Sequence, residues 1–182
     1  KRVYDACVAS KIPTYVLTDD MRIFELFNSR NCWIDETPYE NGTERCAGAI
    51  KNDFFSAYDQ FINVQGDMPD VTLEMIEKTE WHLQHYHVTT MRTTMPEEKQ
   101  NDPHTVKLVR DADKCLWFGR GMTGYGDWHL GIYGYTRRAL EQYNTLTITK
   151  EENIEKLEQL RWLKNGWDIG VLPCEFDGME IN

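Results

Sequence analysis

Short apolar runs alternate with helix-like patterns through the first half of the chain, which begins with the apparent end of a helix at residues 2–9. The runs predict strands at 14–18, 32–34, 60–65 and 88–95, and the segments between them predict helices at 19–27, 43–50 and 73–83. Strands that alternate with helices of this length are typical of βαβ units, in which helices cover both faces of a parallel sheet. We therefore expect an α/β fold with a mostly parallel sheet, and residues 60–65 are the best candidate for its central strand.

The pattern changes after residue 105. Two apolar runs flank a turn-like stretch at residues 111–114, which predicts a hairpin and hence a local antiparallel addition to the sheet. A strand at 129–135, a helix at 137–143 and one long amphipathic helix at 154–164 are expected to follow. No repeat or linker interrupts the sequence, so residues 1–182 are expected to form a single domain.

Composition narrows the classes of function. The chain has 182 residues, of which 41% are hydrophobic, and a formal net charge of −10. An acidic chain lacks the lysine and arginine surplus that binding to nucleic-acid phosphates requires. No apolar run is long enough to cross a bilayer, so no membrane association is expected. The five cysteines form no C-x-x-C pair and are odd in number, which favours a reducing compartment and a cytoplasmic protein.

Asp67 is the first candidate for chemistry, because it directly follows the apolar run at 60–65. The carboxyl ends of strands in open α/β sheets are where ligands bind. A lone carboxylate at this position is suited to hold Mg²⁺ together with phosphate oxygens and water. The alternative is that Asp67 only caps the following helix.

A loop-to-helix junction at Asn41, Gly42, Thr43, Glu44 and Arg45 is the second candidate. Its glycine permits close backbone approach, and the free N–H groups of a first helical turn can bind an anion or a polar base. A capped helix start with no ligand explains the same residues.

Two polar segments of the second half could bind a polyhydroxylated ligand. Strand alternation places His129, Gly131 and Tyr133 on one face, where the glycine leaves space for a sugar. Glu158 and Gln159 are expected on the long helix, beside its leucine stripe. The alternatives are an edge strand with half-buried tyrosines and an ordinary solvated helix face.

Taken in order, six motifs resemble the CMP-Kdo synthetase (3-deoxy-manno-octulosonate cytidylyltransferase) family along the whole chain. They are NGTER, NVQGDxP, VKxVxDAD, FGR, HLGIYGY and LEQLR. The resemblance implies a three-layer, Rossmann-like nucleotidyltransferase fold. It also implies a Mg²⁺-dependent transferase that moves CMP from CTP to the anomeric hydroxyl of Kdo or a related acidic sugar, releases pyrophosphate and serves lipopolysaccharide biosynthesis.

The resemblance also implies roles for particular residues. Asp67 would bind Mg²⁺, and Asp67 and Arg120 would be the catalytic residues. The nucleotide-binding segment would be Asn41, Gly42, Thr43, Glu44 and Arg45. The residues similar to sugar ligands in the family are Gln65, Arg120, His129, Tyr133, Glu158 and Gln159. Asn182 stands where the family has an aspartate that is the second Mg²⁺ ligand.

Several departures from the family carry their own expectations. The family's opening strand and its glycine-, arginine- and lysine-containing triphosphate loop have no counterpart, so the chain is expected to be truncated at both ends relative to the family. The strands at 14–18 and 60–65 would then lack a shared neighbour, and we expect another chain or a rearranged segment to cover the gap. The family's homodimer contact involves the stretch between Arg120 and His129, which is shorter here. A non-catalytic nucleotide- or sugar-binding remnant, or a different acidic sugar, are the alternative functions.

Overall fold

The structure, a computed structural model, describes residues 1–178 and contains two β-sheets. The strands are β1 (Val16–Thr18), β2 (Cys32–Ile34), β3 (Gln60–Val64), β4 (Val88–Thr93), β5 (Lys107–Asp111), β6 (Lys114–Gly119), β7 (Asp127–Thr136) and β8 (Ile169–Pro173). The α-helices are α1 (Arg2–Val8), α2 (Met21–Phe24), α3 (Gly42–Ala49), α4 (Leu73–His82), α5 (Arg137–Tyr143), α6 (Lys150–Glu155) and α7 (Leu160–Lys164). Most of the predicted elements are present, with ends shifted by a few residues.

The main sheet has six strands in the order β3-β7-β4-β8-β6-β5 and is mixed. The strands β3, β4 and β8 run in one direction, and β7 runs against them between β3 and β4. The predicted hairpin is confirmed as β5 and β6, and Ala112 at its turn adopts a left-handed φ of 50°. The sheet therefore combines a parallel set of strands with antiparallel additions.

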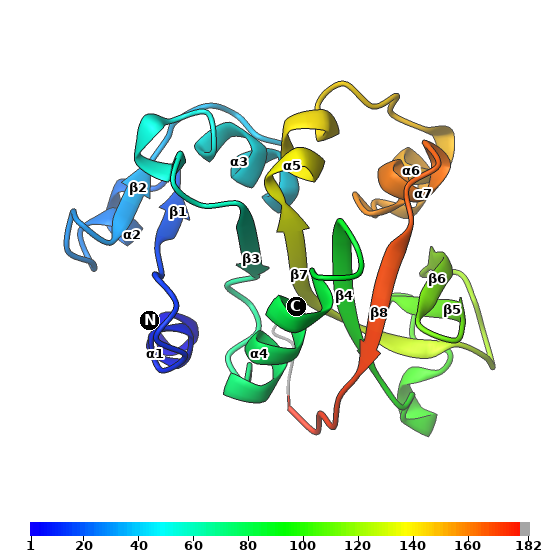
Figure 1. Cartoon of the computed structure of the whole chain (residues 1–182). Coiled ribbons are helices and arrows are strands. Elements are labelled where there is room, and N and C mark those ends of the chain that lie inside the picture. Colours follow the sequence, from blue (N-terminus) through cyan, green and yellow to red (C-terminus); the bar gives the residue numbers. More distant parts are fainter. Residues whose placement is uncertain (179–182) are drawn as a thin grey trace.

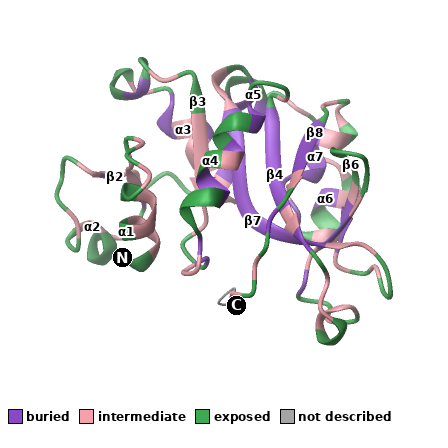
Figure 2. Cartoon of the chain, turned by 60° about the horizontal axis from the view of Figure 1, so that its bottom comes forward, coloured by how far each residue is buried: buried purple, intermediate pink, exposed green. Residues whose placement is uncertain are grey.

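Strand β7 is the buried centre of the molecule, so the edge-strand alternative for residues 129–135 is wrong. It pairs with β3 on one side and β4 on the other, and Figure 2 shows it among the most buried elements. Its alternate side chains serve two cores: Leu130 and Ile132 pack on one face, and Tyr133 and Tyr135 on the other. Helix α4 contacts the sheet beside the first core, and α5 contacts it beside α3.

Strand β3 lies at the end of the main sheet, not at its centre as its apolar pattern predicted. Its free edge faces the two-stranded sheet of β1 and β2, which Figure 1 shows set apart from it. A cavity of about 750 Å³ separates the sheets and is lined by residues 14–18 and 60–67, among others. The expected gap between these strands is present, and what covers it stays a prediction.

The predicted long helix at 154–164 is wrong, because two short helices, α6 and α7, replace it. Lys156 ends α6 in the left-handed conformation, with a φ of 55°. An ion pair of 2.6 Å joins Arg161 Nη2 to Glu152 Oε1. In one continuous helix these residues, nine apart, would be separated by about 13 Å along the axis, so the chain must turn back between them. Glu158 and Gln159 consequently lie in the connection between two helices, not on a helix face.

Candidate active site

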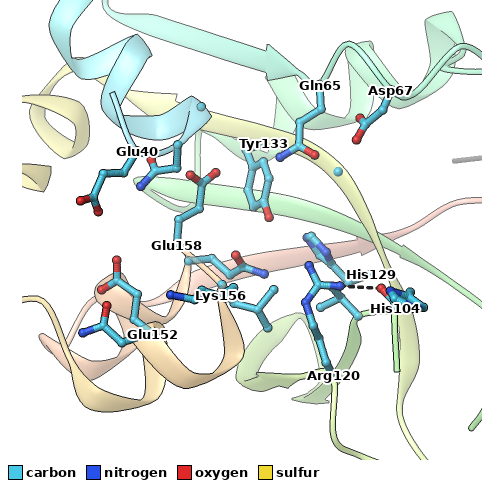
Figure 3. A pocket seen from close by; sticks show the side chains of 17 residues that line it. Glu40, Gln65, Asp67, His104, Arg120, His129, Tyr133, Glu152, Lys156 and Glu158 are labelled. Atoms are coloured by element: carbon cyan, nitrogen blue, oxygen red, sulfur yellow. Dashed lines mark hydrogen bonds between the residues drawn. The ribbon is translucent and has the colours of Figure 1, made fainter. Parts of the chain in front are cut away.

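One cavity gathers residues from five separate segments of the chain. Its volume is about 710 Å³, and it lies beside β7, between the end of β3 and the connection from α6 to α7 (Figure 3). Nine of the eleven described residues assigned to binding or catalysis line it: Asn41, Gly42, Gln65, Asp67, Arg120, His129, Tyr133, Glu158 and Gln159. Segments up to about 120 residues apart in sequence thus form a single concave surface.

Asp67 and Gln65 occupy the wall that follows β3. Asp67 is exposed, and it does not cap the next helix, because Thr72 Oγ1 accepts the hydrogen bond from Met75 N at the start of α4. Gln65 lies against Gly131 of β7, where a Cβ atom would come within 2.8 Å of Gln65 Oε1. Glycine at position 131 therefore makes room for the Gln65 amide at the cavity wall.

The segment 41–45 begins helix α3, and only its first two residues line the cavity. Asn41 caps the helix by accepting a hydrogen bond from Glu44 N at 2.8 Å, so the capped-helix alternative is correct as local structure. Thr43 and Arg45 point elsewhere: Thr43 Oγ1 bonds the Tyr135 hydroxyl at 2.8 Å, and Arg45 pairs with Asp19 at 2.9 Å.

Arg120 supplies a positive charge that no carboxylate neutralises directly. Its Nε donates to the backbone oxygen of Glu155 at 3.2 Å, and its Nη1 to that of His104 at 2.5 Å. Within residues 1–178 it forms no ion pair, and its Nη2 has no hydrogen-bond partner. An anionic ligand could therefore take up this guanidinium as a charge-assisted partner.

His129 is fully enclosed and neutral at physiological pH. Burial, with a smaller contribution from the charge on Arg120, lowers the pKa of His129 from 6.5 to about 3. Its Nε2 lies 3.0 Å from Thr90 Oγ1, and its ring packs against Phe118 and Tyr133. A neutral imidazole of this kind orients a ligand through hydrogen bonds and does not supply a proton.

Glu158 and Gln159 present buried polar atoms that lack partners. Glu158 Oε2 accepts a long hydrogen bond of 3.4 Å from Thr43 N, whereas its Oε1 is buried and has no partner within the described chain. Gln159 is 3% exposed, and its Nε2 is also without a partner there. Burial raises the pKa of the Glu158 carboxyl, although the Thr43 hydrogen bonds oppose this. Unpaired buried groups are costly, so both atoms are suited to meet a polar ligand.

An ionic network behind the cavity was not foreseen from the sequence. Arg161, which is 3% exposed, pairs with Glu152 of α6 at 2.6 Å and with Glu44 of α3 at 3.2 Å. Its backbone N–H also donates to the carbonyl oxygen of Glu158. The arginine of LEQLR thus holds the segment at 41–45 against the connection that carries Glu158. The motif contained this residue, but only a folded chain brings its two partners together.

Two expectations concern metal and membrane. Asn182 lies outside the described residues, so the structure gives no position for it. Within residues 1–178 no three or more histidine, cysteine, aspartate or glutamate side chains form a group that could hold a metal ion. In the same range no helix is long and apolar enough to span a bilayer.

Comparison with known proteins identifies relatives over most of the chain. The family model described as Cytidylyltransferase matches residues 1–169. The 8-amino-3,8-dideoxy-manno-octulosonate cytidylyltransferase of Shewanella loihica is 34% identical, and the match covers 100% of this chain and 82% of that protein. The 3-deoxy-manno-octulosonate cytidylyltransferase 2 of Hydrogenovibrio crunogenus is 36% identical, with 92% of this chain and 75% of that protein covered.

A solved structure supports the same relationship in three dimensions. A CMP:2-keto-3-deoxy-manno-octonic acid synthetase complexed with CTP superposes with a TM-score of 0.89 at 25% identity, covering 99% of this chain and 80% of that one. The inositol-1-phosphate CTP transferase of T. maritima, at 10% identity and a TM-score of 0.64, shares the fold. The expected Rossmann-like nucleotidyltransferase fold is therefore confirmed, and the chain belongs to the cytidylyltransferase family.

Proposed function

We propose that this protein transfers CMP from CTP to the anomeric hydroxyl of 3-deoxy-manno-octulosonate or a closely related acidic sugar. The observation that carries the proposal is the single cavity lined by Asp67, Arg120, His129 and Glu158. The names of the relatives point to the same class of reaction, since they are cytidylyltransferases of such sugars.

In this reaction the anomeric oxygen of the sugar attacks the α-phosphorus of CTP. A new P–O bond forms, the bond to the β-phosphate oxygen breaks, pyrophosphate leaves, and the hydroxyl proton passes to solvent. Positioning and charge stabilisation account for most of the catalysis in phosphoryl and nucleotidyl transfer. The residues of the cavity therefore have to align two polar substrates more than they have to exchange protons.

The residues of this chain divide that work between the two substrates. Arg120, with no carboxylate partner, would bind the sugar carboxylate. Neutral His129 and Tyr133 would fix the sugar ring through hydrogen bonds and contact. Asn41 and Gly42, at the start of α3, would meet the nucleotide, since the first turn of a helix favours polar and anionic groups.

Mg²⁺ is part of the proposal, and the donor set at Asp67 fits it. An exposed carboxylate at the cavity wall matches the preference of Mg²⁺ for one or two carboxylates plus phosphate oxygens and water. When bound there, the ion would neutralise charge on the triphosphate. Asn182 remains the second predicted ligand.

The proposal is tested by measuring pyrophosphate release from CTP with 3-deoxy-manno-octulosonate and Mg²⁺. We expect turnover that requires both substrates and that falls by at least about a hundredfold in Asp67→Asn, as for loss of a charged group that acts in the transition state. Calorimetry of CTP and sugar binding accompanies the assay. Binding of both substrates without pyrophosphate release would assign the chain the alternative role of a non-catalytic binding protein.

Location and assembly are proposed on weaker grounds of the same kind. The five cysteines are free thiols, which suits a reducing compartment, and we propose a cytoplasmic protein. A homodimer stays a prediction, and sedimentation velocity of the purified chain would test it.

A further inference from the structure

The two ends of the cavity carry opposite charge. Figure 3 shows Arg120 beside His104 at one end, and Glu40 and Glu158 towards the other. Arg120 has no ion-pair partner within residues 1–178, so its end offers an uncompensated cation. A ligand that fills the cavity from end to end therefore meets positive charge first and negative charge last.

The acidic end holds more carboxylates than cations. Arg161 is a single guanidinium that serves both Glu44 and Glu152. Glu158 lies next to this network and shares no ion pair with it, and Glu40 adds a further exposed carboxylate at the rim. Lys156 is the other cation that lines this end, and within the described chain it forms no ion pair. Four carboxylates against two cations leave an excess of negative charge.

Glu158 is the group at this end with most to gain from a ligand. Its Oε1 is buried and unpartnered, although the same carboxylate is close to Thr43 N through Oε2. Gln159 beside it directs an unpartnered Nε2 into the same space from a residue that is 3% exposed. A ligand bearing an ammonium and an adjacent hydroxyl would satisfy both atoms, since the ammonium donates to Glu158 and the hydroxyl oxygen accepts from Gln159.

We propose that the acceptor is a zwitterionic amino-sugar acid, with its carboxylate at Arg120 and its ammonium at Glu158. This inference rests on the proposed function and narrows its substrate from acidic sugars in general to those that carry an amine at the end remote from the carboxylate. A neutral terminal hydroxyl in the same place would donate a weaker hydrogen bond and would leave the excess negative charge uncompensated.

The test compares 8-amino-3,8-dideoxy-manno-octulosonate with 3-deoxy-manno-octulosonate, which carry an amine or a hydroxyl at the same carbon. Pyrophosphate release gives kcat/KM for each, and calorimetry in the presence of CMP gives each dissociation constant. We expect the amino sugar to be preferred by about tenfold to a hundredfold, the range for a hydrogen bond to a charged group. The variant Glu158→Gln should lose most of this preference, because it removes the charge and keeps the shape.

The control is Glu40→Gln, which removes an exposed carboxylate at the rim and should change the preference less than about threefold. Equal use of the two sugars, a preference for the hydroxyl sugar, or an equal loss for both sugars in Glu158→Gln would overturn the inference. If neither sugar releases pyrophosphate, the proposed function fails, and the ratio of the two dissociation constants still decides whether the site selects an amine.

Discussion

His129 shows how burial sets the chemistry of a single residue. The strand pattern predicted its face, but only the fold reveals that it is enclosed by Phe118, Tyr133 and Thr90. Burial removes the water that would solvate an imidazolium, which lowers the pKa of His129 to about 3. Gly131, two residues later on β7, has the complementary effect of admitting the Gln65 side chain.

The first prediction concerns the pH dependence of stability. A histidine whose pKa is lowered in the folded state binds its proton more readily when unfolded, so stability is lost as pH falls through the unfolded pKa of about 6.5. We expect the free energy of unfolding of the wild type to fall by about 2 kcal/mol more than that of His129→Gln between pH 7 and pH 5. Urea unfolding at both pH values measures this, and parallel losses in the two proteins would contradict it.

The second prediction concerns Gly131. The variant Gly131→Ala should push away the flexible end of Gln65 and raise the KM of the sugar by about tenfold, as for one lost hydrogen bond. Its melting temperature should change little. The matched control is Gly134→Ala on the same strand, whose Cβ would meet core side chains within 2.6 Å and should cost about 1–3 kcal/mol of stability. Destabilisation of Gly131→Ala to the same extent would show that position 131 serves packing alone.

At the scale of elements, local patterns predicted what local forces determine. Helix α5 and strand β2 have the predicted ends, because capping and side-chain alternation are local signals. The division of 150–164 into α6 and α7 was missed, since its cause is the contact of Arg161 with Glu44, 117 residues away. Strand β8 was not predicted either, because only its pairing with β4 separates the short run Ile169–Pro173 from a loop.

The third prediction tests the ionic network that joins α3, α6 and α7. The variant Arg161→Ala leaves Glu44 and Glu152 without their shared cation in a buried setting and should cost about 3–5 kcal/mol. Lys164→Ala, on the same helix, removes an exposed pair with Glu151 and should cost less than about 1 kcal/mol. Denaturant unfolding of both variants gives the comparison, and similar small losses would show that the network contributes little.

At the scale of the whole molecule, the order of motifs was the strongest signal. No single motif specified the family, yet their sequence from NGTER to LEQLR predicted both the cytidylyltransferase family and the convergence of distant segments on one cavity. The sequence could not predict how charge is distributed around that cavity. That distribution depends on which carboxylates Arg161 neutralises and which it leaves without a cation.

The central claim is that Asp67, Arg120, His129 and Glu158 surround one substrate site. The most direct measurement is a crystal structure of the protein with Mg²⁺, a non-hydrolysable CTP analogue and the acceptor sugar. The account predicts sugar density in the cavity beside β7, with the carboxylate hydrogen-bonded to Arg120 and the opposite end at Glu158. Sugar bound elsewhere, such as in the space between β1 and β3, would contradict it.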